Sequence, residues 1–279
     1  QPPTPNWQAW VRAPVDGLGY TSTDEMLRWS DGRLRAAIDK ALLARFGPGG
    51  RVGPGPIHCD HWHNAGNLWV DHLHKPNRTR GKHILDYGSG VGIESLALAK
   101  LGNTISIADI VPSNLKLVQR VLRVAGYGHA LRHVLHLNAT WPYFELPPGE
   151  TVDVFYSNGV LHHTPELPGI LQRVSPLVTE EVRLMLYNEH MWHKATGTAA
   201  PECGADITSQ PGFLAFLRYC DPVGWYADFY TLDKLTAAVG SHYALTAYHD
   251  IGPQAGWIHS VMTLVPHRLL GGGAGEAGS

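Results

Sequence analysis

The chain has 279 residues, of which 44% are hydrophobic and 16% charged, and its formal net charge is −2 at pH 7. This length can bury a full core but is too short for two large independent domains. The net charge is small and no run of Lys or Arg is present, so the sequence lacks the basic patch that is typical of nucleic-acid-binding proteins. This favours a small molecule as the partner.

Two further features bear on where the protein resides. Its 3 cysteines are odd in number and widely spaced, so they imply no disulfide framework and fit a reducing compartment. No apolar run has the length of a membrane span, and the first residues lack the basic and apolar regions of a signal peptide. We therefore expect a cytoplasmic protein, and the sequence gives no indication of its oligomeric state.

Residues 1–80 are predicted to form a helical cap. Ser22 and Glu25 have the spacing of a capping box. Apolar residues then repeat on one helical face up to Gly47, namely Leu27, Leu34, Ile38, Leu42 and Phe46. Residues 1–20 are expected to be irregular, and the Gly/Pro-rich stretch after the helix is expected to be a linker.

From residue 83 onward, short apolar runs alternate with helical patterns, which is typical of βαβ units around a mostly parallel sheet. Strands are predicted at residues 83–87, 104–110, 132–137, 152–157, 182–187, 243–250 and 257–265. Helices are predicted near residues 94–100, 112–126, 167–174 and 233–239. The pattern predicts an α/β fold with a Rossmann-like, doubly wound sheet over residues 81–270, followed by a disordered tail at 271–279.

The segment 191–230, after the fifth strand, is too long for a simple connection. It is rich in aromatic residues, namely Trp192, Phe213, Phe216, Tyr219, Trp225, Tyr226, Phe229 and Tyr230. We therefore expect an ordered insertion that acts as a substrate lid. Its aromatic residues either bury the insertion itself or line a pocket, and in the second case the acceptor is apolar or aromatic.

A glycine-rich turn lies directly between the first predicted strand of the sheet and its helix, with the sequence Asp86-Tyr87-Gly88-Ser89-Gly90-Val91-Gly92. Its spacing differs from the dinucleotide fingerprint G-x-G-x-x-G/A, because Ile93 occupies the place of the third small residue. A phosphate-binding Lys is also missing, which excludes a P-loop. Asp109 ends the second strand, where a carboxylate can accept both ribose hydroxyls of a nucleoside. The turn therefore predicts a ligand that contains adenosine but is not a nicotinamide dinucleotide.

In these motifs the chain resembles the class I S-adenosylmethionine-dependent methyltransferases, in particular the small-molecule branch of the ubiquinone and menaquinone biosynthesis type. Residues 86–92 match the first motif of that family, and 105–110 match the strand that ends in the ribose-binding acid. Residues 152–165 (VDVFYSNGVLHHTP) match the fourth-strand motif with its His pair. The resemblance covers roughly residues 60–265.

This resemblance implies a sheet of seven strands whose last strand is antiparallel, and S-adenosyl-L-methionine as the cofactor. It also implies a set of cofactor-binding residues at the ends of the strands, namely Asp86, Gly88, Gly90, Gly92, Asp109, Ile110, Asn138, Ala139 and Asn158. Asn138 stands where members of the family commonly have an acid, so its contact with the adenine is the weakest of these inferences.

Methyl transfer is an in-line displacement, which requires a nucleophile ~3 Å from the methyl carbon and, for a hydroxyl acceptor, a base. His162 and His163 follow the fourth strand, where the donor methyl should lie, so each is a candidate base as well as a candidate structural residue. Glu189, after the fifth strand, is expected to orient a His or a substrate amine. Substrate contacts are expected from Tyr187, His190, Trp192, Trp225 and Tyr226.

Alternative functions rest on other residues. A cluster of metal-ligand types precedes the sheet, namely His58, Asp60, His61, His63, His72 and His74. It contains no complete metal motif, so we expect no metal, and a metal-assisted methyltransferase that uses His58 to His63 is kept as an alternative. A catalytically silent S-adenosylmethionine-binding subunit is another. Ile93 disfavours an NAD-dependent dehydrogenase, and Ser157-Asn158-Gly159-Val160 disfavours a nucleic-acid amine methyltransferase. The leading hypothesis is a small-molecule methyltransferase, with O-methylation preferred over N- or C-methylation.

Overall fold

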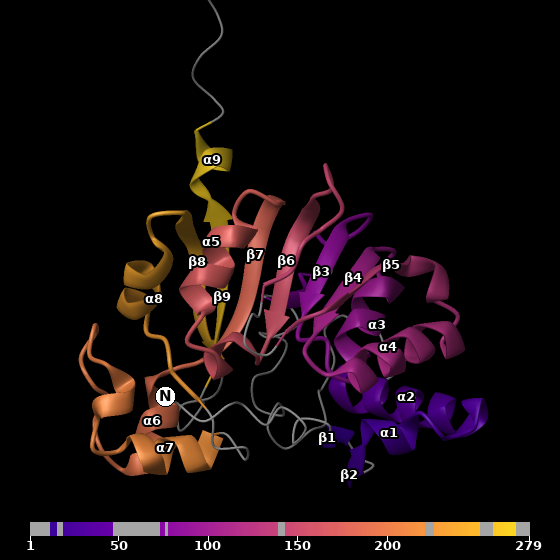
Figure 1. Cartoon of the computed structure of the whole chain (residues 1–279), viewed down its shortest axis with the longest axis horizontal. Helices are drawn as coiled ribbons and strands as arrows, with labels where there is room; N and C mark the ends of the chain where they lie inside the picture. Colours follow the sequence, from indigo (N-terminus) through magenta and orange to yellow (C-terminus); the bar gives the residue numbers. More distant parts are fainter. Residues whose placement is uncertain are drawn as a thin grey trace, which may run out of the picture.

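A seven-stranded sheet with the order β5-β4-β3-β6-β7-β9-β8 forms the centre of the computed structural model (Figure 1). The structure describes residues 12–15, 19–46, 73–75, 78–138, 143–220, 226–251 and 259–271. The strands are β3 (His83–Tyr87), β4 (Thr104–Asp109), β5 (Leu131–His136), β6 (Val152–Asn158), β7 (Val178–Tyr187), β8 (Tyr243–Ile251) and β9 (His259–Pro266). β9 is antiparallel to both of its neighbours, whereas β5, β4, β3, β6 and β7 are parallel.

Helices cover both faces of the sheet, because neighbouring residues of each buried strand point to opposite sides. Ile84 contributes to the core on one face, with α3 (Ile93–Lys100) and α4 (Pro112–Val124). Leu85 contributes to the core on the other face, with α5 (Leu167–Val174) and α8 (Leu232–Val239). The predicted doubly wound α/β fold with an antiparallel last strand is therefore confirmed.

The N-terminal helical segment differs from its prediction, because it is divided into α1 (Thr23–Met26) and α2 (Asp31–Phe46). Ser22 caps α1 by accepting the backbone N–H of Glu25 at 3.1 Å, as predicted. The division has a long-range cause: the guanidinium of Arg120, on α4, donates to the carbonyls of Met26 and Leu27 at 3.2 and 2.7 Å. The Leu27 carbonyl thus has a partner outside the helix where α1 ends, while the Met26 carbonyl also accepts the backbone N–H of Trp29 at 3.2 Å.

Residues 1–20 were expected to be irregular, and this expectation is wrong for two short segments. β1 (Arg12–Val15) and β2 (Gly19–Ser22) pair as an antiparallel hairpin. In the part of the chain that the structure describes, the remaining short elements are three 3-10 helices and a final helix, namely η4 (Gly128–Ala130), η5 (Leu161–His163), η6 (Ile207–Ser209) and α9 (His267–Leu270). None of the described helices is long and apolar enough to cross a membrane.

The segment after β7 is ordered where it is described, with α6 (Glu189–Thr196) and α7 (Phe213–Cys220) beyond the end of the sheet toward which β6 and β7 run (Figure 1). It has a small hydrophobic core of its own. Trp192 is 2% exposed, and its ring centroid lies 5.2 Å from that of Phe216 and 6.0 Å from that of Phe229. The domain limits at residue 80 and the role of this insertion as a lid stay predictions.

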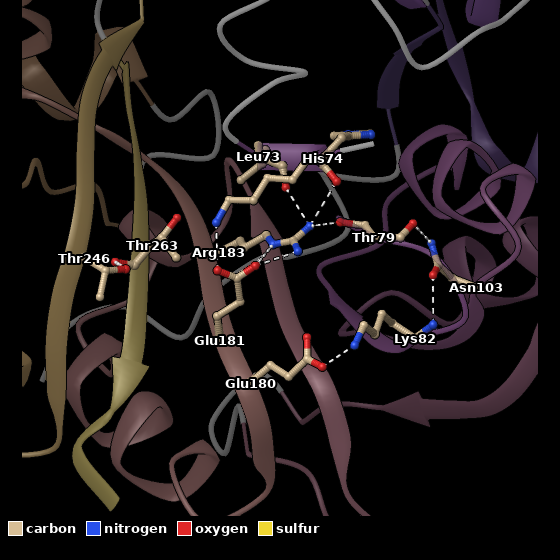
Figure 2. Close-up of polar contacts among 11 residues, drawn as sticks. Leu73, His74, Thr79, Lys82, Asn103, Glu180, Glu181, Arg183, Thr246 and Thr263 are labelled. Atoms are coloured by element: carbon tan, nitrogen blue, oxygen red, sulfur yellow. Dashed lines mark hydrogen bonds and ion pairs between the residues drawn. The ribbon is translucent and has the colours of Figure 1, made fainter. Parts of the chain in front are cut away.

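A buried ion-pair network fixes the stretch before β3 against β7 (Figure 2). Arg183, which is 1% exposed, donates to the carbonyl of His74 at 3.0 Å and to Oγ1 of Thr79 at 2.7 Å. Its charge is paired with Glu181 at 2.6 Å, and Glu181 also binds Lys75 at 2.7 Å. Each buried charge therefore has a partner, as a low-dielectric environment requires.

Candidate active site

The glycine-rich turn has the backbone conformation that its sequence predicts. Gly88, Gly90 and Gly92 all have positive φ, at 79°, 51° and 83°. A Cβ on Gly88 would lie 2.4 Å from the side chain of Val160, and one on Gly92 would lie 2.9 Å from Val118. Gly90 differs, because a Cβ there would meet none of the described residues within 4 Å. The turn is thus tightly packed at its ends and open at Gly90, where a ligand can approach the backbone.

Asp109 is buried at the carboxyl end of β4, beside this turn. Its Oδ2 accepts the backbone N–H of Gly90 at 2.9 Å, and its Oδ1 accepts that of Val111 at 2.8 Å. The side-chain amide of Asn114 lies 3.3 Å from both oxygens. Burial raises the pKa of Asp109, and these hydrogen bonds oppose that effect. The carboxylate is therefore held in one orientation across the turn. Asn114 was not among the predicted residues, although its position in the first turn of the predicted helix after Asp109 could have indicated it.

The other predicted cofactor-binding residues lie along the same edge of the sheet. Asp86 is buried in β3 and accepts a hydrogen bond from the hydroxyl of Ser95, in α3. Ile110 follows β4, Asn138 comes shortly after β5, and Asn158 ends β6. Because the parallel strands β5, β4, β3 and β6 are neighbours, their carboxyl ends bring these residues to one side of the sheet. Ala139 lies outside the described residues.

His162 lies in η5 and is 1% exposed. Its Nδ1 accepts the backbone N–H of Tyr187 at 3.1 Å, and its ring stacks on the Tyr187 ring at a centroid distance of 3.6 Å. Burial lowers the pKa of His162 well below its ordinary value, and the nearby His163 and His259 lower it further. His162 is therefore neutral with its proton on Nε2, and it could accept a proton only by losing the bond from Tyr187.

His163 is held by the opposite type of contact. Its Nδ1 lies 3.3 Å from the backbone carbonyl oxygen of Tyr226. A carbonyl oxygen only accepts, so Nδ1 carries the proton in this contact and the lone pair of the neutral ring is on Nε2. The two adjacent imidazoles are thus in different tautomers, and of the two it is His163 whose tautomer suits a base.

The predicted substrate residues are distributed over three environments. Tyr187 is half-buried beside the His pair, and its ring centroid lies 5.5 Å from that of His163. Glu189 and His190 begin α6, where Glu189 is half-buried and His190 is exposed. Trp192 packs inside the insertion as part of its hydrophobic core, and its contact with a substrate stays a prediction. Tyr226 is half-buried beside His163, and Trp225 lies outside the described residues.

Two buried polar residues near this edge were missed. Asn188 caps α6 by accepting the N–H of His190 at 3.1 Å, and its amide donates to the carbonyl of His259 at 3.2 Å. Asp228 binds Lys234 at 2.5 Å. Asn188 directly precedes a helical pattern, so the N-cap preference for Asn could have identified it. No local sequence pattern identifies Asp228 as a buried residue near the site.

The predicted metal-ligand cluster lies largely outside the described residues, which include only His74 of its six members. The Nε2 atom of His74 is 2.6 Å from Oε2 of Glu94 and 3.0 Å from the hydroxyl of Tyr156. Among the described residues, no group of three or more His, Cys, Asp or Glu side chains is placed to hold a metal ion.

Comparison with known proteins agrees with this geometry. Residues 85–186 match the family model described as "Methyltransferase domain". A curated relative, the ubiquinone biosynthesis O-methyltransferase of Coxiella burnetii, is 26% identical over 152 residues, which are 50% of this chain and 58% of that protein. The chain therefore spans less than two thirds of that relative. The resemblance to methyltransferases that the sequence predicts is confirmed for the matched residues.

Two solved structures share the fold, each with a TM-score of 0.51. The CcbJ methyltransferase from Streptomyces caelestis is 14% identical and covers 77% of this chain and 93% of its own. An S-adenosylmethionine-dependent methyltransferase from Clostridium acetobutylicum is 9% identical and covers 75% of this chain and 92% of its own. At these identities the similarity concerns the fold alone.

Proposed function

We propose that this chain, whose residues 85–186 match a methyltransferase domain, transfers the methyl group of S-adenosyl-L-methionine to a small acceptor. The observation that carries the proposal is the fixed carboxylate of Asp109, held 2.9 Å from the N–H of Gly90 beside a glycine turn with G-x-G-x-G spacing. The acceptor is a small apolar or aromatic molecule and not a nucleic acid, and we expect the reaction to take place in the cytoplasm.

The residues at this edge fit that cofactor. The oriented carboxylate of Asp109 suits the two hydroxyls of a ribose, and the open space at Gly90 admits a ligand against the backbone. Asp86 places a second buried carboxylate beside the turn, which suits a ligand that carries an ammonium and a sulfonium charge. Asn138 and Ala139 are assigned to the adenine, and Ile110 and Asn158 to the borders of the same site.

When bound, the cofactor supplies a methyl group on a positively charged sulfur. An acceptor oxygen would take this methyl group by in-line displacement, and the sulfur would keep the electron pair of its bond to the methyl carbon. The acceptor proton passes to Nε2 of His163, whose Nδ1 already carries a proton toward Tyr226. Tyr187 and Tyr226 are assigned to the acceptor, and Glu189 and His190 to its polar groups. Holding the reacting atoms together can lower the barrier of such a displacement by up to about 7–11 kcal/mol.

Calorimetric titration with S-adenosylhomocysteine tests the donor half of this proposal. We expect the native chain to bind it, and Asp109→Ala to bind roughly 100-fold more weakly, because two hydrogen bonds to a charged group are lost. Asp233→Ala is the matched control, since Asp233 is exposed on α8 and should leave the affinity unchanged. NAD is the control ligand and should not bind. A folded native chain that fails to bind S-adenosylhomocysteine would overturn the assignment.

Turnover tests the transfer half. Incubation with S-adenosylmethionine and a panel of phenols and naphthols should release S-adenosylhomocysteine in the presence of a suitable acceptor. Binding of the cofactor without turnover of any acceptor, including amines and carbon acids, would favour the silent-subunit alternative.

A further inference from the structure

We propose that Asp228 is a positioning residue for methyl transfer, which acts through the Tyr226 main chain to hold His163 in the tautomer that accepts a proton. This inference rests on the proposed function and deepens it, because it assigns the support of the base to a segment of the chain that follows the insertion. That segment, residues 226–230, is called the strap below.

The strap is bonded to both elements that carry the acceptor side of the site. The N–H of Asp228 donates to the carbonyl of His162 at 2.8 Å, and the N–H of Tyr230 donates to the carbonyl of Tyr187 at 2.8 Å. Between these two bonds the backbone is fixed against η5 and the end of β7. The carbonyl of Tyr226, two residues before Asp228, is thereby placed 3.3 Å from Nδ1 of His163.

Asp228 organises this segment from within. It is 5% exposed, and its Oδ1 accepts the backbone N–H of Phe229 at 2.8 Å. Its Oδ2 accepts the hydroxyl of Tyr226 at 3.2 Å, so both ends of Tyr226 are engaged: the carbonyl with His163 and the side chain with Asp228. Changes at the carboxylate are therefore transmitted to the carbonyl that selects the tautomer of His163.

Burial of the Asp228 carboxylate costs free energy, which indicates that its charge has a function. Burial raises the pKa of Asp228, and Lys234 opposes that effect at a distance of 2.5 Å. The ammonium of Lys234 is in turn packed over the rings of Phe229 and Tyr230, at 4.8 and 5.3 Å from their centroids. A strap held only by packing would need neither charge.

We expect the two charges of this pair to act on His163 in opposite directions. When His163 takes the acceptor proton it becomes an imidazolium, which a neighbouring carboxylate stabilises and a neighbouring ammonium destabilises. Among the described residues, the other titratable groups beside it are His162 in η5, Tyr187 at the end of β7 and Tyr226 in the strap. The ring of His259 contacts the rings of His162 and Tyr187, at centroid distances of 6.3 and 5.0 Å. His162 stays neutral because of its burial, so Asp228 and Lys234 are the charged pair on the strap side.

Imidazole nitrogen NMR of the full chain with bound S-adenosylhomocysteine tests the inference directly, and His162→Gln and His163→Gln assign the two signals. We expect the Nδ1–H tautomer at His163 and the Nε2–H tautomer at His162. Asp228→Asn should lower the midpoint of the His163 titration by roughly half a pH unit or more, and Lys234→Met should raise it by a similar amount. Asp233→Asn removes the same charge from an exposed position on α8 and should move neither signal.

Opposite shifts of the His163 midpoint in Asp228→Asn and Lys234→Met indicate a positioning role. If these substitutions only loosened the strap, they would both move the midpoint in the same direction. An Nε2–H tautomer at His163, or a midpoint that is the same in native and Asp228→Asn protein of unchanged S-adenosylhomocysteine affinity, would overturn the inference. If Asp228→Asn does not fold, Lys234→Met and Tyr226→Phe replace it. An unchanged His163 midpoint in Lys234→Met, together with an unchanged His163 tautomer population in Tyr226→Phe, would also overturn the inference. Loss of cofactor binding by the native chain would instead overturn the proposed function, so the two failures are distinguishable.

Discussion

The donor edge of the site, at the ends of β3 and β4, and the acceptor edge, around η5, β7 and the strap, are built from different kinds of contact. At the donor edge, the bonds of Asp109 join groups between residues 90 and 114, within one βαβ unit and the start of the helix that follows it. At the acceptor edge, His162 is bonded to Tyr187, and His163 is bonded to Tyr226, 63 residues further along the chain.

Because of this difference, the geometry of each edge depends on different segments of the chain. The residues that hold Asp109 at the donor edge are close in sequence, so the geometry of that edge is set mainly by a short motif. The acceptor edge requires the insertion and the strap to return to the sheet, so its geometry depends on segments distant in sequence. We therefore expect substitutions at the acceptor edge to alter turnover while leaving donor binding intact, and the converse at the donor edge.

The largest expected effect comes from His163→Gln. A glutamine amide can replace the bond to the Tyr226 carbonyl but cannot accept a proton, so kcat should fall about 100-fold or more. The affinity for S-adenosylhomocysteine should change less than about twofold, because the donor edge is untouched. Steady-state turnover and calorimetry measure the two quantities. Equal losses of turnover and of donor affinity would show that the two edges are coupled and would contradict their independence.

The contrast between the edges also explains how much of the molecule its sequence predicts. The strands and the glycine turn follow from local periodicity and spacing, and Asp109 lies where the motif places it. The division between α1 and α2 could not be predicted, because it depends on Arg120 reaching the carbonyls of Met26 and Leu27 from α4.

The same limit applies to the site residues of the acceptor edge. Trp192 is an aromatic residue in a predicted lid, and only the tertiary packing against Phe216 and Phe229 shows that it belongs to a core. The sequence presents His162 and His163 as equivalent. Their tautomers differ because each ring meets a different backbone group, one an N–H and the other a carbonyl.

Two glycine variants test which part of the turn at the donor edge is open to a ligand. Gly88→Ala adds a Cβ that meets three carbon atoms of Val160 at 2.4 to 2.9 Å, and it also imposes a left-handed backbone on Ala. We expect it to lower the free energy of unfolding by roughly 2–4 kcal/mol. Gly90→Ala meets only the conformational penalty, roughly 1–2 kcal/mol, but its methyl group enters the proposed ligand space. Urea unfolding and calorimetry should show the larger stability loss at Gly88 and the larger affinity loss at Gly90. The reverse order would contradict an open ligand face at Gly90.

The smallest expected effect is a pH dependence at the acceptor edge. The folded chain holds the pKa of His162 well below its ordinary value, chiefly through burial, whereas the unfolded chain binds a proton at His162 near pH 6.5. The unfolded state therefore takes up more protons below that pH, and the free energy of unfolding falls as the pH decreases from about 6.5 toward the folded-state pKa, by at most about 1.4 kcal/mol per pH unit for this residue. His162→Gln removes this titration. Its destabilisation relative to the native chain, measured by urea unfolding, should thus be largest at pH 7.5 and shrink toward pH 5. A difference that stays constant over that range would mean that His162 takes up its proton alike in the folded and the unfolded chain, which would contradict a lowered folded-state pKa of His162.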